Sequence, residues 1–136
     1  MRLSLGVCLL LALVWPSPAA ARQVWHRAGA STFGGPCEPS EHTGYRGDFL
    51  PARWRSFAEL NMGTALGGLP YGARIRVLNL RTHRRLNIRR RDIGAGGGPV
   101  FGVPRVIDLY FPVTRFLDPS ASCSSWTGVI WWRRLS

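Results

Sequence analysis

Two aspartates have neighbours that could support chemistry on sugars. Asp92 follows three arginines and precedes a glycine-rich stretch over residues 94–98, and Asp108 lies in the apolar segment 106–109. Cleavage of a glycosidic bond needs a group that delivers a proton to the leaving oxygen, and many glycosidases add a second carboxylate. Glycines beside an acid let another chain approach the backbone closely. We therefore expect Asp92 to be the candidate acid/base, with Asp108 or Glu59 as its helper.

Both aspartates also have a structural interpretation. Asp92 could accept backbone N–H bonds in a turn, and Asp108 could accept the free N–H groups of a following helix. The adjacent arginines are expected to lower the pKa of Asp92, which opposes a role as a general acid near neutral pH. Strand alternation predicts that Arg90 lies on the same face as Asp92 and that Arg91 faces the opposite way.

Short strands are the elements that must position these residues. Residues 73–80 and 85–89 alternate between basic or small and aliphatic side chains, which is typical of half-buried strands in a hairpin. Residues 105–109 and 128–133 indicate two more strands, and residues 112–117 a short helix that begins at a proline.

The composition favours the same class of fold. Sixteen glycines and ten prolines disfavour a helical bundle, because glycine weakens helix interiors and proline breaks them. Shorter extended segments are expected at residues 30–34 and 57–60. The sequence therefore predicts a mostly β fold, a small closed barrel of five or six strands with one or two short helices.

The first 21 residues have the pattern of an export signal. Met1 and Arg2 are followed by an apolar stretch to Trp15 and by small residues that end at Ala21. The apolar run of about 13 residues is shorter than the roughly 20 needed to span a bilayer. We expect cleavage before Arg22, a single domain over residues 22–136 without a transmembrane segment, and a secreted or periplasmic location.

Cys37 and Cys123 are the cysteines that follow this signal. An oxidising compartment favours their pairing. A disulfide that closes so long a loop would stabilise the fold by about 2–4 kcal/mol. Two separate buried thiols are the alternative.

Five short motifs, in this order, resemble the rare lipoprotein A (RlpA)-like double-psi β-barrel family over roughly residues 28–134. They are ASTFG at 30–34, LPYG at 69–72, NLR at 79–81, RDIG at 91–94 and VIDL at 106–109. The resemblance implies a six-stranded double-psi barrel in a cell-wall polysaccharide context, with some relatives acting as lytic transglycosylases on peptidoglycan. In the same barrel, which expansins and a group of endoglucanases share, the acidic positions correspond to the segments of Asp92 and Asp108.

The chain departs from this family in two places. Relatives believed to be catalytic carry an upstream Gly-Glu pair and a histidine four residues before the proline of the LPYG motif, and here that position is Leu66. Glu59, the nearest upstream acid, is offset from the family's glutamate. The glycine loop after Asp92 is also longer than the family's. The departures favour a binding module over an enzyme and leave catalysis open.

The charge balance predicts an anionic partner. The chain has 18 arginines and no lysine against 7 acidic residues. Arginine matches carboxylates and phosphates through paired hydrogen bonds. Peptidoglycan stem-peptide carboxylates, teichoic-acid phosphates and anionic lipid surfaces all fit, whereas nucleic acid is not expected for an exported chain. The candidate substrate-binding residues are Tyr45, Glu59, Tyr71, Arg89 and Arg91.

Nothing in the sequence indicates a cofactor or a metal. His26, His42 and His83 lie far apart without metal-ligand spacing, and the glycine run lacks the Lys-Ser/Thr ending of a phosphate-binding loop. Alternation turns one of Trp131 and Trp132 outward, where it could form a platform for sugars.

We therefore predict an exported protein that binds the cell wall. Two alternatives remain. One is a lytic transglycosylase that uses Asp92, and the other is a basic secreted protein that binds or attacks the surface of other cells.

Overall fold

The structure, a computed structural model, describes residues 23–41, 43–48, 50, 55–123 and 125–136. The predicted export signal over residues 1–21 and His42 lie outside the described residues. Six strands, two short helices and one 3-10 turn follow one another in this part of the chain. They are β1 (His26–Phe33), η1 (Gly35–Cys37), β2 (Ser56–Glu59), α1 (Leu60–Gly63), β3 (Arg74–Asn79), β4 (Arg84–Ile93), β5 (Arg105–Tyr110), α2 (Phe111–Leu117) and β6 (Thr127–Arg134).

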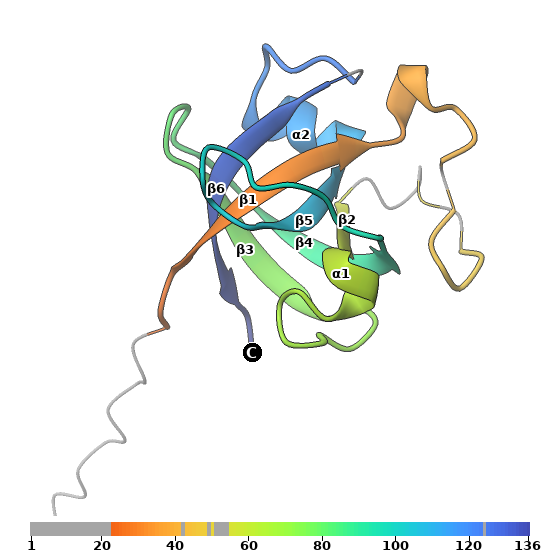
Figure 1. Cartoon of the computed structure of the whole chain (residues 1–136), viewed down its shortest axis with the longest axis horizontal. Coiled ribbons are helices and arrows are strands. Elements are labelled where there is room, and N and C mark those ends of the chain that lie inside the picture. Colours follow the sequence, from red (N-terminus) through yellow and green to blue (C-terminus); the bar gives the residue numbers. More distant parts are fainter. Residues whose placement is uncertain (1–22, 42, 49, 51–54, 124) are drawn as a thin grey trace, which may run out of the picture.

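The six strands close into a mixed barrel in the order β1-β5-β2-β4-β3-β6 (Figure 1). The pairs β1·β5 and β2·β4 are parallel, and the other four neighbouring pairs are antiparallel. Closure gives each of these strands a hydrogen-bonded neighbour on both sides. The prediction of a mostly β fold, a small closed barrel with short helices, is confirmed.

Two strands, β4 and β1, extend by several residues beyond the sequence pattern. β4 was expected over residues 85–89, but it continues to Ile93 because its last residues pair in parallel with β2. β1 begins at His26 because its first residues pair with β6, where His26 lies opposite Trp132. Both extensions depend on partners that are distant in the sequence.

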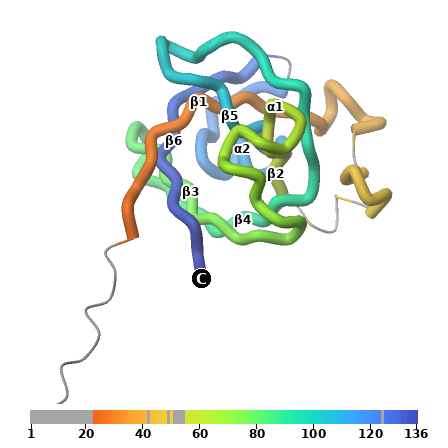
Figure 2. The backbone as a smooth tube through the Cα atoms, turned by 60° about the horizontal axis from the view of Figure 1, so that its bottom comes forward, coloured from red at the N-terminus to blue at the C-terminus, as the bar shows by residue number. Residues whose placement is uncertain are grey.

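The core lies inside the barrel and alternates along the strands as expected. Ile75 and Val77 of β3 and Ile107 and Leu109 of β5 are completely buried. α2 adds Val113 and Leu117 to the same hydrophobic cluster. Figure 2 shows the path of the backbone around this core. No helix among the described residues is long and apolar enough to cross a membrane.

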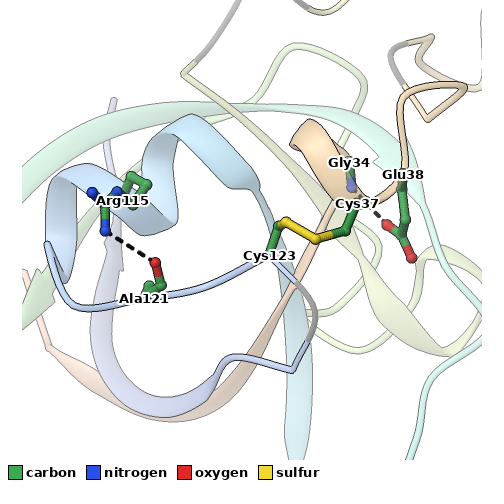
Figure 3. The surroundings of a disulfide bond; sticks show 6 residues. All are labelled: Gly34, Cys37, Glu38, Arg115, Ala121 and Cys123. Atoms are coloured by element: carbon green, nitrogen blue, oxygen red, sulfur yellow. Dashed lines mark hydrogen bonds between the residues drawn. A yellow bond between two sulfur atoms is a disulfide. The ribbon is translucent and has the colours of Figure 1, made fainter.

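A disulfide fastens the segment between β1 and β2 to the barrel. Cys37 in η1 is bonded to Cys123, between α2 and β6, with Cα atoms 5.7 Å apart (Figure 3). Gly34 turns the chain into η1 with a φ of 71°, and its N–H donates to Glu38 Oε2 at 2.7 Å. An added Cβ at Gly34 would lie 2.7 Å from the Tyr110 ring. The predicted pairing of the two cysteines is confirmed.

Candidate functional site

Asp92 and Asp108 lie on the same outer face of the barrel. Both pair with Ala58 of β2, Asp92 from β4 and Asp108 from β5. Residues that pair directly point to the same side of a sheet, and the adjacent pair Phe57 and Leu109 points into the core. Since neighbouring strands lie about 4.8 Å apart, the two aspartate backbones are about 10 Å apart across β2. The topology thus brings the two predicted carboxyls together.

A one-residue shift in register sets the orientation of Asp92. Phe57 pairs with Arg90 and Ala58 pairs with Asp92, so Arg91 is an extra residue in β4. Arg90 therefore points into the barrel with Phe57, while Asp92 points outward with Ala58. The prediction that Arg90 shares the face of Asp92 is wrong, because simple alternation does not include this bulge.

Burial raises the pKa of Asp92 above its usual range. The backbone N–H groups of Ile93, 2.8 Å from Oδ1, and Tyr45 oppose this shift, whereas the charges of Glu41 and Asp48 reinforce it. The expectation that the adjacent arginines lower this pKa is wrong, since the bulge turns Arg90 into the barrel. The raised pKa favours an acid that keeps its proton to higher pH. These two hydrogen bonds from backbone N–H groups are also the contacts expected if Asp92 is a structural turn residue.

Burial also raises the pKa of Asp108. The Ser31 hydroxyl, which donates to Asp108 Oδ1 at 2.8 Å, and the charge of Arg105 oppose this shift. The charges of Glu38 and Asp92 reinforce it. Asp108 lies within β5, and α2 begins after Tyr110 without a side-chain cap. The predicted helix-capping role of Asp108 is therefore wrong, because the strand continues to the start of the helix.

Five of the seven acidic residues lie on or near the face that carries Asp92 and Asp108. Glu41 and Asp48 are close enough to Asp92, and Glu38 to Asp108, to act on their pKa values electrostatically. Gly44 lets this segment pack on β4, since an added Cβ would lie 2.5 Å from the Arg91 carbonyl oxygen. Among the described residues, no group of three or more His, Cys, Asp or Glu side chains could hold a metal ion.

Tyr45 and Tyr71 form an aromatic pair beside Asp92. Their ring centroids are 5.3 Å apart in an edge-to-face arrangement. The guanidinium groups of Arg46 and Arg91 lie over the Tyr71 ring, 4.2 and 5.1 Å from its centroid. The structure thus brings the predicted residues Tyr45, Tyr71 and Arg91 to Asp92. It adds Arg46, whose only sequence signal is its place next to Tyr45 in a glycine-flanked loop.

Glu59 lies inside the barrel and is completely buried. Its carboxylate accepts the N–H groups of Leu66, Gly68 and Leu69 at 2.7, 2.9 and 2.9 Å. Its Oε2 also lies 3.2 Å from Arg90 Nε. These contacts hold the segment between α1 and β3, and they leave no exposed surface on Glu59 for a ligand.

Arg89 lies in β4 on the exposed outer side of the β3·β4 hairpin. It pairs with Arg74 of β3, and its guanidinium reaches the Gly72 carbonyl oxygen at 3.5 Å. Arg89 therefore contacts the residue that follows Tyr71 in the chain, through the carbonyl oxygen of Gly72.

A scan of the chain against protein-family models matches no family, and a search of the curated proteins finds no match. The structure itself defines the class: a small, closed, six-stranded mixed β-barrel with two carboxyls on one outer face.

Proposed function

We propose that this chain is an exported double-psi β-barrel protein of the RlpA-like type that binds peptidoglycan through the face bearing Asp92 and Asp108. The arrangement of the barrel supports this proposal. Its two parallel pairs, β1·β5 and β2·β4, each contain a register shift, between Gly29 and Ala30 and between Phe57 and Ala58. The two halves of the barrel are thus built alike.

One observation carries the proposal. Ser31 from the ASTFG motif donates to Asp108 from the VIDL motif at 2.8 Å, and Asp92 from the RDIG motif lies on the same face across Ala58. Three motifs that are separate in the sequence therefore meet at one place. A shared position of this kind is expected of a functional site.

The chemistry of this face suits a peptidoglycan strand. The two carboxyls can accept hydrogen bonds from sugar hydroxyls, and the partly exposed Tyr45 ring offers an apolar surface for a sugar face. Arg46 and Arg91 supply guanidinium groups that match the carboxylates of stem peptides.

A second candidate function, lytic transglycosylation, is favoured by the raised pKa values of both aspartates. Asp92 would donate its proton to the glycosidic oxygen while the bond from that oxygen to the anomeric carbon breaks. Its carboxylate would then take the proton of the sugar's own 6-hydroxyl as that oxygen bonds to the anomeric carbon. The product is an anhydro sugar, and Asp92 regains its proton.

Incubation with purified sacculi tests both functions. The proposal expects the protein to sediment with sacculi, and mass spectrometry of the supernatant separates anhydro products, reducing ends and no release. Tyr45→Ala should weaken sedimentation by roughly 10-fold, since stacking on one ring is worth about 1 kcal/mol or more. Phe101→Ala, which removes a more exposed ring outside this face, is the matched control.

A protein that does not sediment with sacculi would contradict the wall-binding proposal. The predicted alternative of a basic secreted protein that binds other cell surfaces would then be tested with whole cells. Export is checked separately, because the intact mass of the exported protein should correspond to residues 22–136.

A further inference from the structure

The sheet formed by β4, β3 and β6 presents a strongly cationic outer face. Arg74 lies opposite Arg89, and Arg76 lies opposite Arg133. Like charges that pair directly across strands destabilise a sheet, so this arrangement does not serve stability. Within β3, β4 and β6 the only acid is Asp92, which lies near the end of β4, beyond the bulge at Arg91.

An apolar patch lies in the middle of this cationic surface. Trp25, Leu78, Leu80 and Trp131 line a shallow cavity of about 270 Å³. Leu80 is 51% exposed. The guanidinium of Arg133 lies over the Trp25 ring, 5.0 Å from its centroid. Trp131 is thus the outward member of the tryptophan pair, while Trp132 packs against the core.

Strand register joins the patch and the arginines into one surface. Across β4, β3, β6 and β1 the paired residues are Arg85, Leu78, Trp131 and Arg27. An apolar centre is therefore flanked by an arginine at each end of the row. We call this surface the Arg/Trp face, and it consists of Trp25, Arg27, Arg74, Arg76, Leu78, Leu80, Arg85, Arg89, Trp131 and Arg133.

We propose that the Arg/Trp face docks on an anionic lipid bilayer. Tryptophan is favoured at the interface between water and hydrocarbon, and clustered arginines are attracted to anionic headgroups. Arginine side chains can also lay their apolar stems along the patch while their guanidinium groups reach phosphates. A soluble polyanion would engage the arginines but gains nothing from the apolar centre. A second copy of the chain would bring two faces of the same charge together.

Docking in this way orients the carboxyl face. β2 and β6 are three strands apart in either direction around the closed barrel, so they lie on opposite sides. Figures 1 and 2 show the segment between β1 and β2 on the side away from β6. The middle of the carboxyl face, at Ala58 of β2, would therefore lie away from the membrane, while Asp92 near the end of β4 would lie at the border between the two faces. The docking proposal stands on the Arg/Trp face alone and does not depend on the proposed function.

Sedimentation with lipid vesicles tests the proposal. The protein for this test is residues 22–136, because all six strands and the whole core lie within it and because the apolar run before Ala21 would bind vesicles by itself. Binding is expected to vesicles of phosphatidylcholine with phosphatidylglycerol, and it should be at least 10-fold weaker to phosphatidylcholine alone. Tryptophan fluorescence should shift to shorter wavelength on binding.

Two pairs of substitutions separate the contributions of charge and apolar contact. Arg74→Gln with Arg85→Gln should weaken vesicle binding roughly 10-fold or more, as expected for two interfacial charges. Trp25→Ala with Leu80→Ala should weaken it by a similar factor. Met62→Ala and Arg115→Gln remove an exposed apolar side chain and an exposed charge outside this face, and they should leave binding unchanged. Urea unfolding of each variant shows whether it is folded.

Three results would overturn the proposal. The first is no binding to the anionic vesicles. The second is vesicle binding that depends on Arg74 and Arg85 but not on Trp25 and Leu80, together with competition by free polyphosphate, which would indicate a surface for soluble polyanions. The third is a dimer in solution that Leu80→Ala dissociates, which would indicate a second copy. Sacculus binding is measured on the same variants. In this way a loss of vesicle binding is distinguished from a loss of the proposed wall binding.

Discussion

Glu59 of β2 and Arg90 of β4 form an ion pair inside the barrel, with Glu59 Oε2 3.2 Å from Arg90 Nε. Arg90 also donates to the Leu69 carbonyl oxygen, and Glu59 accepts the Leu69 N–H. The pair therefore ties the turn that carries Tyr71 to the strand that carries Asp92. Two charges inside the barrel thus position parts of the proposed site, and the Arg90 guanidinium also lies 5.6 Å from the centroid of the Tyr45 ring.

Glu59→Gln should destabilise the protein strongly. Loss of one partner from a buried ion pair leaves the other charge uncompensated, which costs about 3–5 kcal/mol. Urea unfolding should show this decrease in the free energy of unfolding. Glu41→Gln, at an exposed position, should change it by less than about 0.5 kcal/mol. Equal midpoints for the two variants would contradict the structural role of Glu59.

The disulfide between Cys37 and Cys123 should contribute about 2–4 kcal/mol to stability by restricting the unfolded chain. Replacement of both cysteines by serine should lower the unfolding midpoint accordingly. Addition of a reductant should lower the midpoint of the wild-type protein and leave that of the double variant unchanged. A wild-type midpoint that is insensitive to reductant, with reduction verified by thiol labelling, would contradict this contribution.

Asp118 should make stability depend on pH in the acidic range. The Arg81 guanidinium, 2.5 Å from Asp118 Oδ2, holds the pKa of this carboxyl well below its usual value of 3.8. The Ser120 hydroxyl and the Trp126 Nε1–H add hydrogen bonds at 2.6 and 3.0 Å. Because the folded state favours the ionised form, this stabilisation is present above pH 3.8 and is lost as the pH falls through the lower folded pKa.

Asp118→Asn should therefore lower the melting temperature at pH 6 and have less effect as the pH falls towards 2. The loss at pH 6 should be about 1.5–3 kcal/mol, as for hydrogen bonds to a charged group. Thermal unfolding of both proteins from pH 2 to pH 7 measures it. A difference in melting temperature between the two proteins that stays constant from pH 2 to pH 7 would show that the charge of Asp118 does not cause the stabilisation.

The strands could be predicted from the sequence wherever their signal is local. Ile75 and Val77 alternate with arginines, so one face of β3 had to be buried whatever its partners. The cysteine pairing could also be predicted, since an even count after an export signal restricts the choices. The extension of β4 to Ile93 could not be, because it depends on β2, which lies far away in the sequence.

The candidate site was less predictable than the fold. Asp92 and Asp108 could be selected from their segments, but their common pairing with Ala58 is a property of the closed barrel. The bulge at Arg91 reverses the face expected for Arg90, and no local pattern encodes it. The burial of Glu59 could not be predicted either. Carboxylates are rarely buried in proteins, and the sequence does not show which N–H groups compensate for the burial of this one.

Asp92→Asn separates a functional carboxyl from a structural one through its effects on stability and on product release. A folded-state pKa above the usual value means that the ionised carboxylate is less favourable in the folded protein than in the unfolded chain. Its stabilising contribution is present below the usual pKa of 3.8 and is lost as the pH rises through the folded pKa. At pH 7 the charge of Asp92 should therefore lower stability.

Asparagine removes that charge and retains an oxygen for the N–H groups of Ile93 and Tyr45. The melting temperature of Asp92→Asn at pH 7 should thus equal or exceed that of the wild type, and the two should converge towards pH 3. If Asp92 is the acid/base, release of anhydro products from sacculi should fall by roughly 10²-fold or more, because proton transfer is lost while the fold is kept. A variant that is instead destabilised by about 1 kcal/mol at pH 7, with any activity following its folded fraction, would assign Asp92 to the turn. A stability change of either sign tests the turn role, and loss of anhydro-product release from a variant that remains folded is the result that assigns Asp92 as the acid/base.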